Sequence, residues 1–414
     1  MIQFLYYIIF AILVVSVKFV FANFAYVTNE SSNDVSVIDT STNTVTATIS
    51  NVGNGPFGIA ITPNGNFAYV VNNGGKNVSV INTSSNTITG ASIPVGNSPF
   101  EIAITPNGDF AYVSNNGSNS VSVINTSTNT VTATILVGTE PFGIAITPNG
   151  NFVYVANNSN SSNTVSVINT STNTVIATIP GFDNPSSISI TPNGSFAYVT
   201  NEGFSNTVSV IQTSTNVITN IIPVGTVSEG IAITPNGNFA YVVNELAHTV
   251  SVINTSSNMV TGAPIPVGNT PFGIAITPNG DFAYVANELG NTVSVINIST
   301  NTVIGTITVG SHPVEIAITP NTAPPVNFRG HQKKNDFAVV YELFNQLQWE
   351  ANSVPGSTVA GYFIYRNGVK IATLSASTFE YEDHNIKKGA TTLYSVAAFD
   401  VHGNQSLFST IEIK

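Results

Sequence analysis

PFGIAITPNGNFAYVVNNGGKNVSVINTSSNTITGASI, residues 56–93, contains four short apolar segments separated by turn residues. The segments cover residues 58–62, 67–71, 78–82 and 87–93. Pro63-Asn64-Gly65 is typical of a tight turn, because proline fixes φ and glycine tolerates a positive φ. None of the segments has helical periodicity, so the unit is predicted to fold as four short β-strands.

This unit recurs along most of the chain. The motif F-[AV]-Y-V begins at Phe24, Phe67, Phe110, Phe152, Phe196, Phe239 and Phe282. Successive copies are 42 to 44 residues apart. A period in the forties that is built from strands is typical of a β-propeller, in which each repeat forms one four-stranded blade.

The two ends of the repeat region are complementary. The first copy begins with the second strand of a unit, Phe24-Ala25-Tyr26-Val27. The N-terminal end therefore supplies three strands of a blade and lacks its first strand. The last copy is followed by a lone first strand, Pro313–Thr319. Pairing the three strands with the one closes a ring and removes long exposed sheet edges. We therefore predict an all-β fold, with a seven-bladed β-propeller (3+1 strand closure) over residues 23–320.

Three stretches of the repeat have a distinctive sequence. They are Tyr26-Val27-Thr28-Asn29, residues 35–45, and the pattern G-I-A-I-T-P-N-G at residues 58–65, and they recur with small changes up to Pro320. In these residues the chain resembles the YVTN β-propeller family of archaeal surface-layer proteins and bacterial exported proteins. Pro185-Ser186-Ser187 departs most from the Pro-Phe-Gly of the other units. The resemblance implies an exported binding or structural role, and it does not imply one enzyme activity.

The composition changes after Asn321. Ala323-Pro324-Pro325 indicates a linker over residues 321–325, and residues 326–414 are predicted to form a β-sandwich. This last segment contains Leu347-Gln348-Trp349, a strand with a hairpin turn over residues 361–368, and Tyr394-Ser395-Val396-Ala397-Ala398. In these residues it resembles a fibronectin type III domain. The segment has no Arg-Gly-Asp motif, so the resemblance implies a spacer or an adhesive module.

Residues 1–22 have the pattern of a secretory signal peptide. Residues 4–17 are uncharged and almost wholly apolar, and Val20-Phe21-Ala22 has residues suited to signal cleavage. No Lys or Arg precedes Lys18, so an uncleaved N-terminal anchor remains an alternative. In either case the protein is predicted to be secreted or extracytoplasmic, in the periplasm or at the cell surface.

The composition excludes several kinds of site. The chain has no Cys, which rules out disulfides, thiol catalysis and Cys-ligated metals. The formal net charge is −11, and residues 23–320 contribute −12 to it, because 13 acidic residues accompany one basic residue, Lys76. Nucleic acid is therefore not an expected partner, because phosphate binding needs a basic surface. No Walker loop, nucleophile elbow or HExxH motif is present.

Most acidic residues of the propeller are predicted to share one face. In an up-and-down blade, the turn between strands two and three and the connection to the next blade lie on the same side. Ten of the 13 acids map to this side: Glu30, Asp34, Glu101, Glu140, Asp183, Glu202, Glu229, Glu245, Glu288 and Glu315. Asp39, Asp109 and Asp281 map to the opposite side. One interpretation of the acidic side is solubility, and the other is a binding surface.

Six residues are candidates for that binding surface: Glu101, Glu229, Glu315, His312, Glu245 and Glu288. Glu101 and Glu315 begin inner strands of blades that are separated by one blade, so both are expected at the mouth of the central channel, with Glu229 and His312 nearby. No catalytic residue is assigned. No cofactor is predicted, although carboxylates with Asn carbonyls are ligands suited to Ca²⁺.

These observations favour a non-enzymatic binding or cell-surface scaffold protein that recognises a protein or glycan partner with its acidic face. We expect a monomer, without a transmembrane domain beyond an uncleaved leader. The alternative is a lactonase-like hydrolase with an acidic site at the channel mouth. That alternative requires Glu101, Glu229, Glu315 and His312 to converge.

Overall fold

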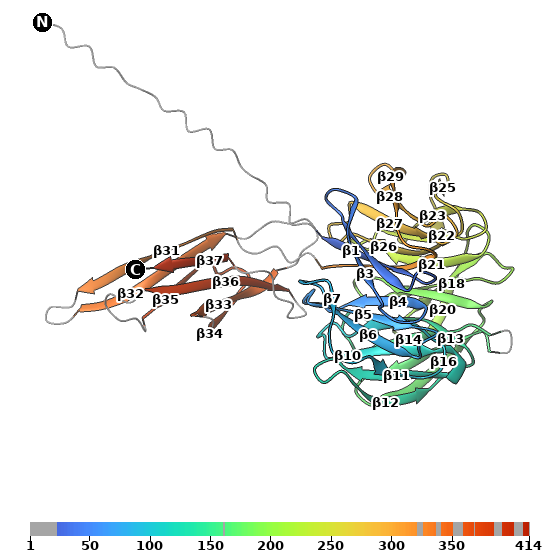
Figure 1. The fold of residues 1–414 in the computed structure, drawn as a ribbon, viewed down its shortest axis with the longest axis horizontal. Coiled ribbons are helices and arrows are strands. Elements are labelled where there is room, and N and C mark those ends of the chain that lie inside the picture. Colours follow the sequence, from blue (N-terminus) through green and yellow to red (C-terminus); the bar gives the residue numbers. More distant parts are fainter. Residues whose placement is uncertain are drawn as a thin grey trace, which may run out of the picture.

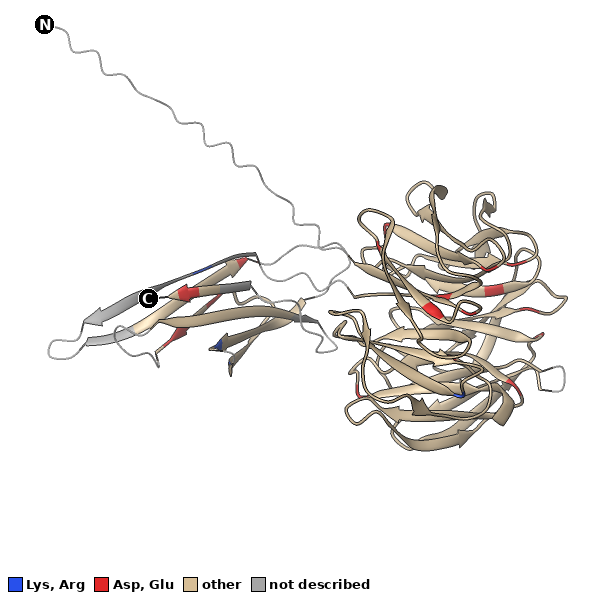
Figure 2. Ribbon diagram, viewed as in Figure 1, with Lys and Arg blue, Asp and Glu red and all other residues tan. Residues whose placement is uncertain are grey.

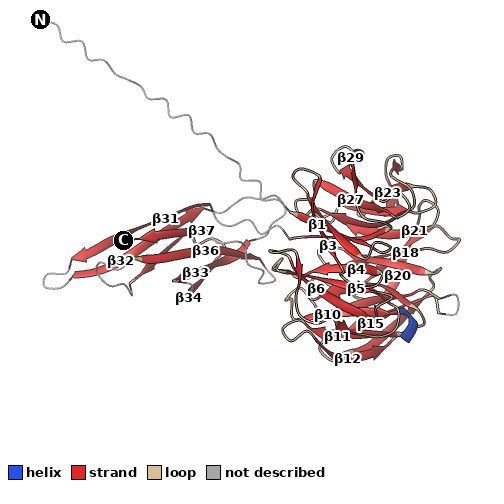
Figure 3. Ribbon diagram, viewed as in Figure 1, coloured by secondary structure: helices blue, strands red, loops and turns tan. Residues whose placement is uncertain are grey.

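Figure 1 shows the fold in a computed structural model. The structure describes residues 23–159, 162–320, 326–336, 341–350, 359–367, 369–384, 391–400 and 409–413. The predicted leader, residues 1–22, and the predicted linker, residues 321–325, lie outside the described residues. Strands dominate, accompanied by a short helix, η1 (Asn116–Ser118), that is coloured blue in Figure 3. In the described part of the chain, no helix is long and apolar enough to cross a membrane.

Seven sheets form the blades of a β-propeller, with the strands of each blade named from the inner to the outer edge. Blade 1 contains β30 (Pro313–Ile318), β1 (Phe24–Asn29), β2 (Asp34–Asp39) and β3 (Thr44–Ser50). Blade 2 contains β4 (Pro56–Ile61), β5 (Phe67–Asn72), β6 (Asn77–Asn82), β7 (Thr87–Ile88) and β8 (Ile93–Pro94). Blade 3 contains β9 (Pro99–Ile104), β10 (Phe110–Asn115), β11 (Ser120–Asn125) and β12 (Thr130–Leu136).

The remaining blades repeat this order. Blade 4 contains β13 (Pro141–Ile146), β14 (Phe152–Asn157), β15 (Thr164–Asn169) and β16 (Thr174–Pro180). Blade 5 contains β17 (Pro185–Ile190), β18 (Phe196–Asn201), β19 (Thr207–Gln212) and β20 (Val217–Pro223). Blade 6 contains β21 (Ser228–Ile233), β22 (Phe239–Asn244), β23 (Thr249–Asn254), β24 (Met259–Val260) and β25 (Ile265–Pro266). Blade 7 contains β26 (Pro271–Ile276), β27 (Phe282–Asn287), β28 (Thr292–Asn297) and β29 (Thr302–Thr308).

The ring closes within blade 1. β30 lies antiparallel to β1, with Tyr26 opposite Ala317 and Val27 opposite Ile316. Each inner strand contacts the inner strands of the two neighbouring blades, so that β30 stands between β26 and β4. The predicted closure by three strands plus one is confirmed, and with it the seven-bladed fold.

The outer edge of blade 2 differs from the prediction of one strand over residues 87–93. The structure has two strands of two residues each, β7 and β8. Between them Gly90 has a φ of 70°, a left-handed conformation that interrupts extended backbone. Blade 6 has the same interruption at Gly262, where φ is 74°. Both interruptions lie in the outermost strands of their blades, so they do not affect the inner strands that line the channel.

Neighbouring blades are joined by buried tyrosines. The second strand of every blade carries a Tyr that is at most 1% exposed: Tyr26, Tyr69, Tyr112, Tyr154, Tyr198, Tyr241 and Tyr284. Each hydroxyl donates a hydrogen bond of 2.5 to 2.8 Å to an Asn in a turn of the next blade. Tyr284 of blade 7 donates to Asn43 of blade 1, which completes the ring. These tyrosines are therefore core residues that join neighbouring blades.

The C-terminal strands form a β-sandwich. One sheet contains β31 (Val326–Asp336), β32 (Tyr341–Glu350) and β35 (Glu380–Asp383). The other contains β34 (Val369–Ser375), β33 (Val359–Arg366), β36 (Thr392–Asp400) and β37 (Ser409–Ile413). Trp349, Tyr362 and Tyr394 are buried in its core. The hydroxyl of Tyr394 donates to Asp383 at 2.6 Å, and Arg366 forms a salt bridge with the same carboxylate at 3.0 Å. The predicted sandwich is confirmed.

Candidate active site at the channel mouth

Backbone hydrogen bonds define the two faces of the propeller. In every blade, the residue after the second strand donates its N–H to the connection that enters from the preceding blade. Glu245 donates to the carbonyl of Val227, and Glu288 to that of Thr270, each at 2.8 Å. These turns and connections therefore share one side, which we call the top face. The opposite side, with the Thr-Pro-Asn-Gly turns, is the bottom face.

An aromatic cluster lies where the inner strands begin. Phe57, Phe100, Phe142 and Phe272 occupy the second position of the inner strands in blades 2, 3, 4 and 7. The ring centroids of Phe100 and Phe142 are 4.5 Å apart, and those of Phe57 and Phe272 are 5.5 Å apart. Phe57 also meets Phe142, although blade 3 stands between their two blades. The phenyl side chains of different blades therefore contact one another inside the circle of inner strands. They make the channel apolar where the inner strands begin.

Blades 5 and 6 carry a polar pair at the same position. Their inner strands have Ser186 and Glu229 in place of phenylalanine, and these residues are 0% and 3% exposed. The hydroxyl of Ser186 donates to Oε2 of Glu229 at 2.6 Å. The buried carboxyl of Glu229, held by the Ser186 hydroxyl, thus occupies the inner-strand position that phenylalanine occupies in the aromatic cluster.

Glu101 and Glu315 occupy the third position of the inner strands in blades 3 and 1. Their carboxylates lie against the inner strands of the preceding blades. A Cβ on Gly273 would collide with the carboxylate of Glu315, and a Cβ on Gly58 would crowd that of Glu101 and collide with the backbone beside it. Both glycines are therefore required by this close approach. The N–H of Ile102 donates to Oε2 of Glu101 at 3.2 Å.

The three inner-strand carboxyls affect one another electrostatically. Burial raises the pKa of Glu101 to about 8. Burial, and then the charges of Glu101 and Glu229, raise the pKa of Glu315 well above its ordinary value. Burial and the charge of Glu202 likewise raise the pKa of Glu229, while the Ser186 hydrogen bond opposes this rise. The effect of Glu101 and Glu229 on Glu315 requires proximity, and carboxyls with raised pKa values are suited to proton transfer near neutral pH.

A second set of carboxylates lies around Glu229 on the top face. Glu202, Glu245, Glu288 and Glu30 directly follow the second strands of blades 5, 6, 7 and 1, and we call these four residues the acidic arc. Burial raises the pKa of Glu245, and the charges of Glu288 and Glu202 add to this rise. The equivalent residues of blades 2, 3 and 4 are Asn73, Asn116 and Asn158. The arc therefore makes the top face asymmetric.

The two histidines of the propeller lie at this arc. Burial raises the pKa of Glu288, and His312 opposes that rise. His248 accepts the backbone N–H of Thr270 on its Nδ1 at 3.0 Å. Of the predicted residues, Glu101, Glu229 and Glu315 come together on the inner strands, whereas Glu245, Glu288 and His312 belong to the surrounding arc. Among the described residues, no group of three or more His, Asp or Glu side chains is arranged to hold a metal ion.

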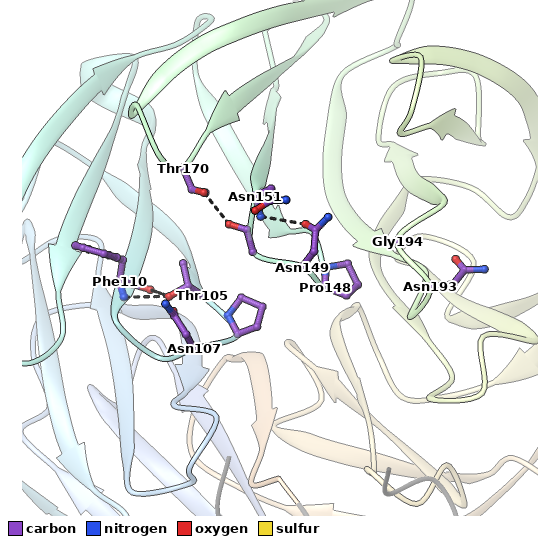
Figure 4. Close-up of a pocket in the computed structure, with 11 residues that line it drawn as sticks. Thr105, Asn107, Phe110, Pro148, Asn149, Asn151, Thr170, Asn193 and Gly194 are labelled. Atoms are coloured by element: carbon purple, nitrogen blue, oxygen red, sulfur yellow. Dashed lines mark hydrogen bonds between the residues drawn. The ribbon is translucent and has the colours of Figure 1, made fainter. Parts of the chain in front are cut away.

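A separate cavity of about 740 Å³ lies at the bottom-face turns of blades 3 to 5. Figure 4 shows Asn107, Asn149 and Asn193 among its lining residues, and the hydrogen bond from Thr170 to the carbonyl of Gly150. The lining residues supply amide, hydroxyl, proline and phenylalanine groups, and no carboxylate or imidazole. This cavity therefore lacks the acid and base groups that the inner-strand carboxyls supply.

Sequence reasoning missed the role of Ser186 and of the aromatic cluster. The relevant signal was present, since Pro185-Ser186-Ser187 departs from the repeat immediately before the blade that carries Glu229. Comparing equivalent positions across all blades, instead of searching for contiguous motifs, would have identified the pair.

A family model described as lactonase, seven-bladed β-propeller, matches residues 42–176 and 225–321, which is more than half of the chain. Both stretches belong to the propeller, and they include Glu101, Glu229 and Glu315. No curated protein sequence matches the chain.

Several solved structures are similar to the chain in fold. A functionally unknown protein from Desulfotomaculum acetoxidans has a TM-score of 0.64 and 22% identity, over 72% of this chain and 100% of that one. A putative 6-phosphogluconolactonase from Bacteroides uniformis has a TM-score of 0.61 and 18% identity, with the same coverage. The hydrazine synthase of Kuenenia stuttgartiensis has a TM-score of 0.59 and 22% identity, over 63% of this chain and 88% of that one. At these identities the similarity establishes the fold alone.

The expectation of a non-enzymatic scaffold protein is wrong. The match to the lactonase family model supports the hydrolase alternative instead. The physical reason for the error is that the carboxyls come from three separate blades. They form no local motif that a search along the sequence can find.

Proposed function

Since the chain belongs to the lactonase family of seven-bladed β-propellers, we propose that it is a hydrolase that opens lactones at the mouth of its channel. The observation that carries this proposal is the group of inner-strand carboxyls, Glu101, Glu229 and Glu315, in which the charges of the first two raise the pKa of Glu315. Lactone hydrolysis needs a group that takes a proton from water and a group that gives one to the leaving oxygen.

The proposed roles follow from the hydrogen bonds. Glu229 is the general base in its ionised form, because the Ser186 hydroxyl orients its carboxyl and lowers its pKa, against the larger rise caused by burial and by the charge of Glu202. Glu101 is the general acid, because burial raises its pKa to about 8 and keeps it protonated at neutral pH. Ser186 is fully buried and acts as a positioning residue. The apolar face of the lactone ring would pack on the aromatic cluster.

The reaction balances with water as the only co-reactant. Water attacks the lactone carbonyl carbon as Glu229 takes its proton, and the carbonyl oxygen becomes an oxyanion. The oxyanion collapses and the ring C–O bond breaks, while Glu101 gives its proton to the leaving oxygen. The product is a hydroxy acid, and a proton moving from Glu229 to Glu101 restores the starting state.

The test measures acid release from uncharged lactones, such as D-glucono-1,5-lactone, above the spontaneous rate. Glu229→Gln keeps the shape of the side chain and a hydrogen-bond acceptor for Ser186, but it removes the base. We expect kcat to fall about 100-fold or more. The matched control is Glu140→Gln, which removes an exposed carboxylate of the top face and should retain the activity of the unaltered protein. An unchanged kcat in Glu229→Gln, or no hydrolysis of any lactone tested, would contradict the proposal.

We also propose that the C-terminal sandwich is a fibronectin type III module that acts as a spacer. Its support is the pairing of a three-stranded with a four-stranded sheet, together with the buried Trp349 and Tyr394. The YVTN character of the repeats and export from the cytoplasm are further proposals. They rest on the repeat sequence and on the leader pattern of residues 1–22.

A further inference from the structure

We propose that this site selects lactones without a negative charge and discriminates against phosphorylated lactones, through repulsion by the acidic arc. This inference rests on the proposed function, because it concerns the substrate of the same site. The proposed substrate preference differs from the one implied by the name of the similar Bacteroides uniformis protein. That protein is described as a putative 6-phosphogluconolactonase.

The propeller offers no cationic group suited to hold a phosphate at the channel mouth. Lys76 is the single Lys or Arg within residues 23–320, and it is exposed in the turn between β5 and β6 of blade 2. Figure 2 shows the acidic positions of the propeller in red and its single Lys or Arg position in blue. Phosphate recognition ordinarily relies on Arg or Lys side chains. Lys76 shares the top face, but it belongs to blade 2, where Asn73 takes the place of a carboxylate of the acidic arc. The acidic residues on the inner strands and in the arc are all Glu.

The arc concentrates negative charge beside Glu229. The charges of Glu202, Glu245 and Glu288 all act on Glu229. They come from three consecutive blades, and Glu30 extends the arc into blade 1. A phosphate carried by a lactone bound at Glu229 would face this charge at short range, in surroundings where water screens it only in part.

The histidines of the arc do not provide an alternative phosphate site. His248 uses Nδ1 to accept the Thr270 N–H, so this nitrogen does not donate to a phosphate. His312 interacts electrostatically with Glu288, and this carboxylate competes with a phosphate for the imidazole.

The same charge favours release of the product. An uncharged lactone enters without repulsion, whereas hydrolysis creates a carboxylate within the acidic surroundings. The site therefore binds the product anion less well than the substrate, and repulsion favours its departure. A phosphorylated substrate would meet this repulsion before reaction as well as after it.

The experiment compares D-glucono-1,5-lactone with its 6-phosphate, two substrates that share the reacting ring and differ in the phosphate. We expect kcat/KM for the uncharged lactone to exceed that for the phosphorylated one by about 100-fold at 10 mM ionic strength. The ratio should shrink towards 1 M salt, where the Debye length falls from about 30 Å to about 3 Å.

Two matched triple variants test the cause. Glu202→Gln, Glu245→Gln and Glu288→Gln together remove three charges from the arc. Asp39→Asn, Asp109→Asn and Asp281→Asn together remove three charges from the bottom face, at positions where most other blades have Asn. The first triple variant should lower the substrate ratio by at least 10-fold, and the second should leave it within 2-fold of the unaltered protein. The ratio is used because a changed pKa of Glu229 affects both substrates alike.

The outcomes separate the two proposals. If neither lactone is hydrolysed, the proposed function fails. If both are hydrolysed equally well, or the phosphorylated one better, the function stands and the charge selection is overturned. A salt-independent ratio, or an equal response of the two triple variants, would also overturn the selection by the arc.

Discussion

At the scale of single residues, the decisive feature is the burial of carboxyls without basic partners. Glu101 retains some exposure, yet burial raises its pKa to about 8, and its polar contact is the N–H of Ile102. In the described propeller no Lys or Arg stands beside it to stabilise the charge. Such groups destabilise the folded chain once ionised, so they are retained at the cost of stability, which is typical of functional sites.

We predict that Glu101→Gln weakens the dependence of stability on pH. Between about pH 4.5 and about pH 8, folded Glu101 keeps a proton that the unfolded chain loses, so the free energy of unfolding falls as the pH rises. Glutamine does not titrate, so between pH 5 and pH 9 the free energy of unfolding of the variant should rise relative to that of the unaltered protein by several kcal/mol, at most about 5. Urea unfolding at pH 5, 7 and 9 measures this effect, with Glu140→Gln as the control. Equal slopes for Glu101→Gln and the unaltered protein would refute the expected titration.

At the scale of elements, two positions of each blade vary together: the third residue of the inner strand and the fifth residue of the second strand. Where the third residue of the inner strand is not Gly, the second strand carries a hydroxyl: Thr28 with Glu315, Ser114 with Glu101, and Thr200 with Ser187. The N–H of the inner-strand residue donates to this hydroxyl, at 3.1, 3.0 and 2.8 Å respectively. In the other four blades the inner residue is Gly and the second-strand residue is Val or Ala. The hydroxyl thus accepts the backbone N–H of the inner strand where that strand carries a side chain in place of Gly.

We predict that Ser114→Ala destabilises the propeller by about 1 to 3 kcal/mol, because the N–H of Glu101 and the carbonyl of Phe142 both lose a buried partner. Ser114→Thr should preserve stability, since blades 1 and 5 carry Thr at this position. Thermal unfolding measures both, and Ser127→Ala, in an exposed turn, is the control. Equal melting temperatures for the Ala variants would show that the hydroxyl is dispensable.

At the scale of the whole molecule, ring closure assembles the site. Glu101, Glu229 and Glu315 are separated by 128 and 86 residues along the chain, and they meet because the inner strands form a closed ring. Glu315 depends on this closure directly, because it lies on β30, the strand that joins blade 1 from the far end of the repeat region. Stability and activity are therefore coupled to the same closing strand.

We predict that a chain ending at residue 312 loses the cooperative fold of the propeller, whereas a chain ending at residue 320 keeps it. The shorter chain leaves β1 unpaired at its inner edge and removes the contacts of β30 with β26 and β4. Near-UV circular dichroism and thermal unfolding distinguish the two chains. A cooperative transition of the shorter chain at the temperature of the longer one would contradict the role of closure.

The sequence by itself determined the all-β class, the seven blades, the closing strand and the face on which each acid lies. These follow from a short period, because the repeat sets strand length and turn type locally, and the complementary ends leave one way to remove the open edges. The candidate carboxyls Glu101, Glu229 and Glu315 followed in turn from their places on the inner strands.

Only the tertiary structure decided how these carboxyls interact. The Ser186–Glu229 hydrogen bond, the aromatic cluster and the raised pKa values depend on side chains of different blades that meet after the ring has closed. The expectation of a non-enzymatic protein was wrong for the same reason. Burial and distance across a ring are properties of three dimensions, and a local pattern of residues does not contain them.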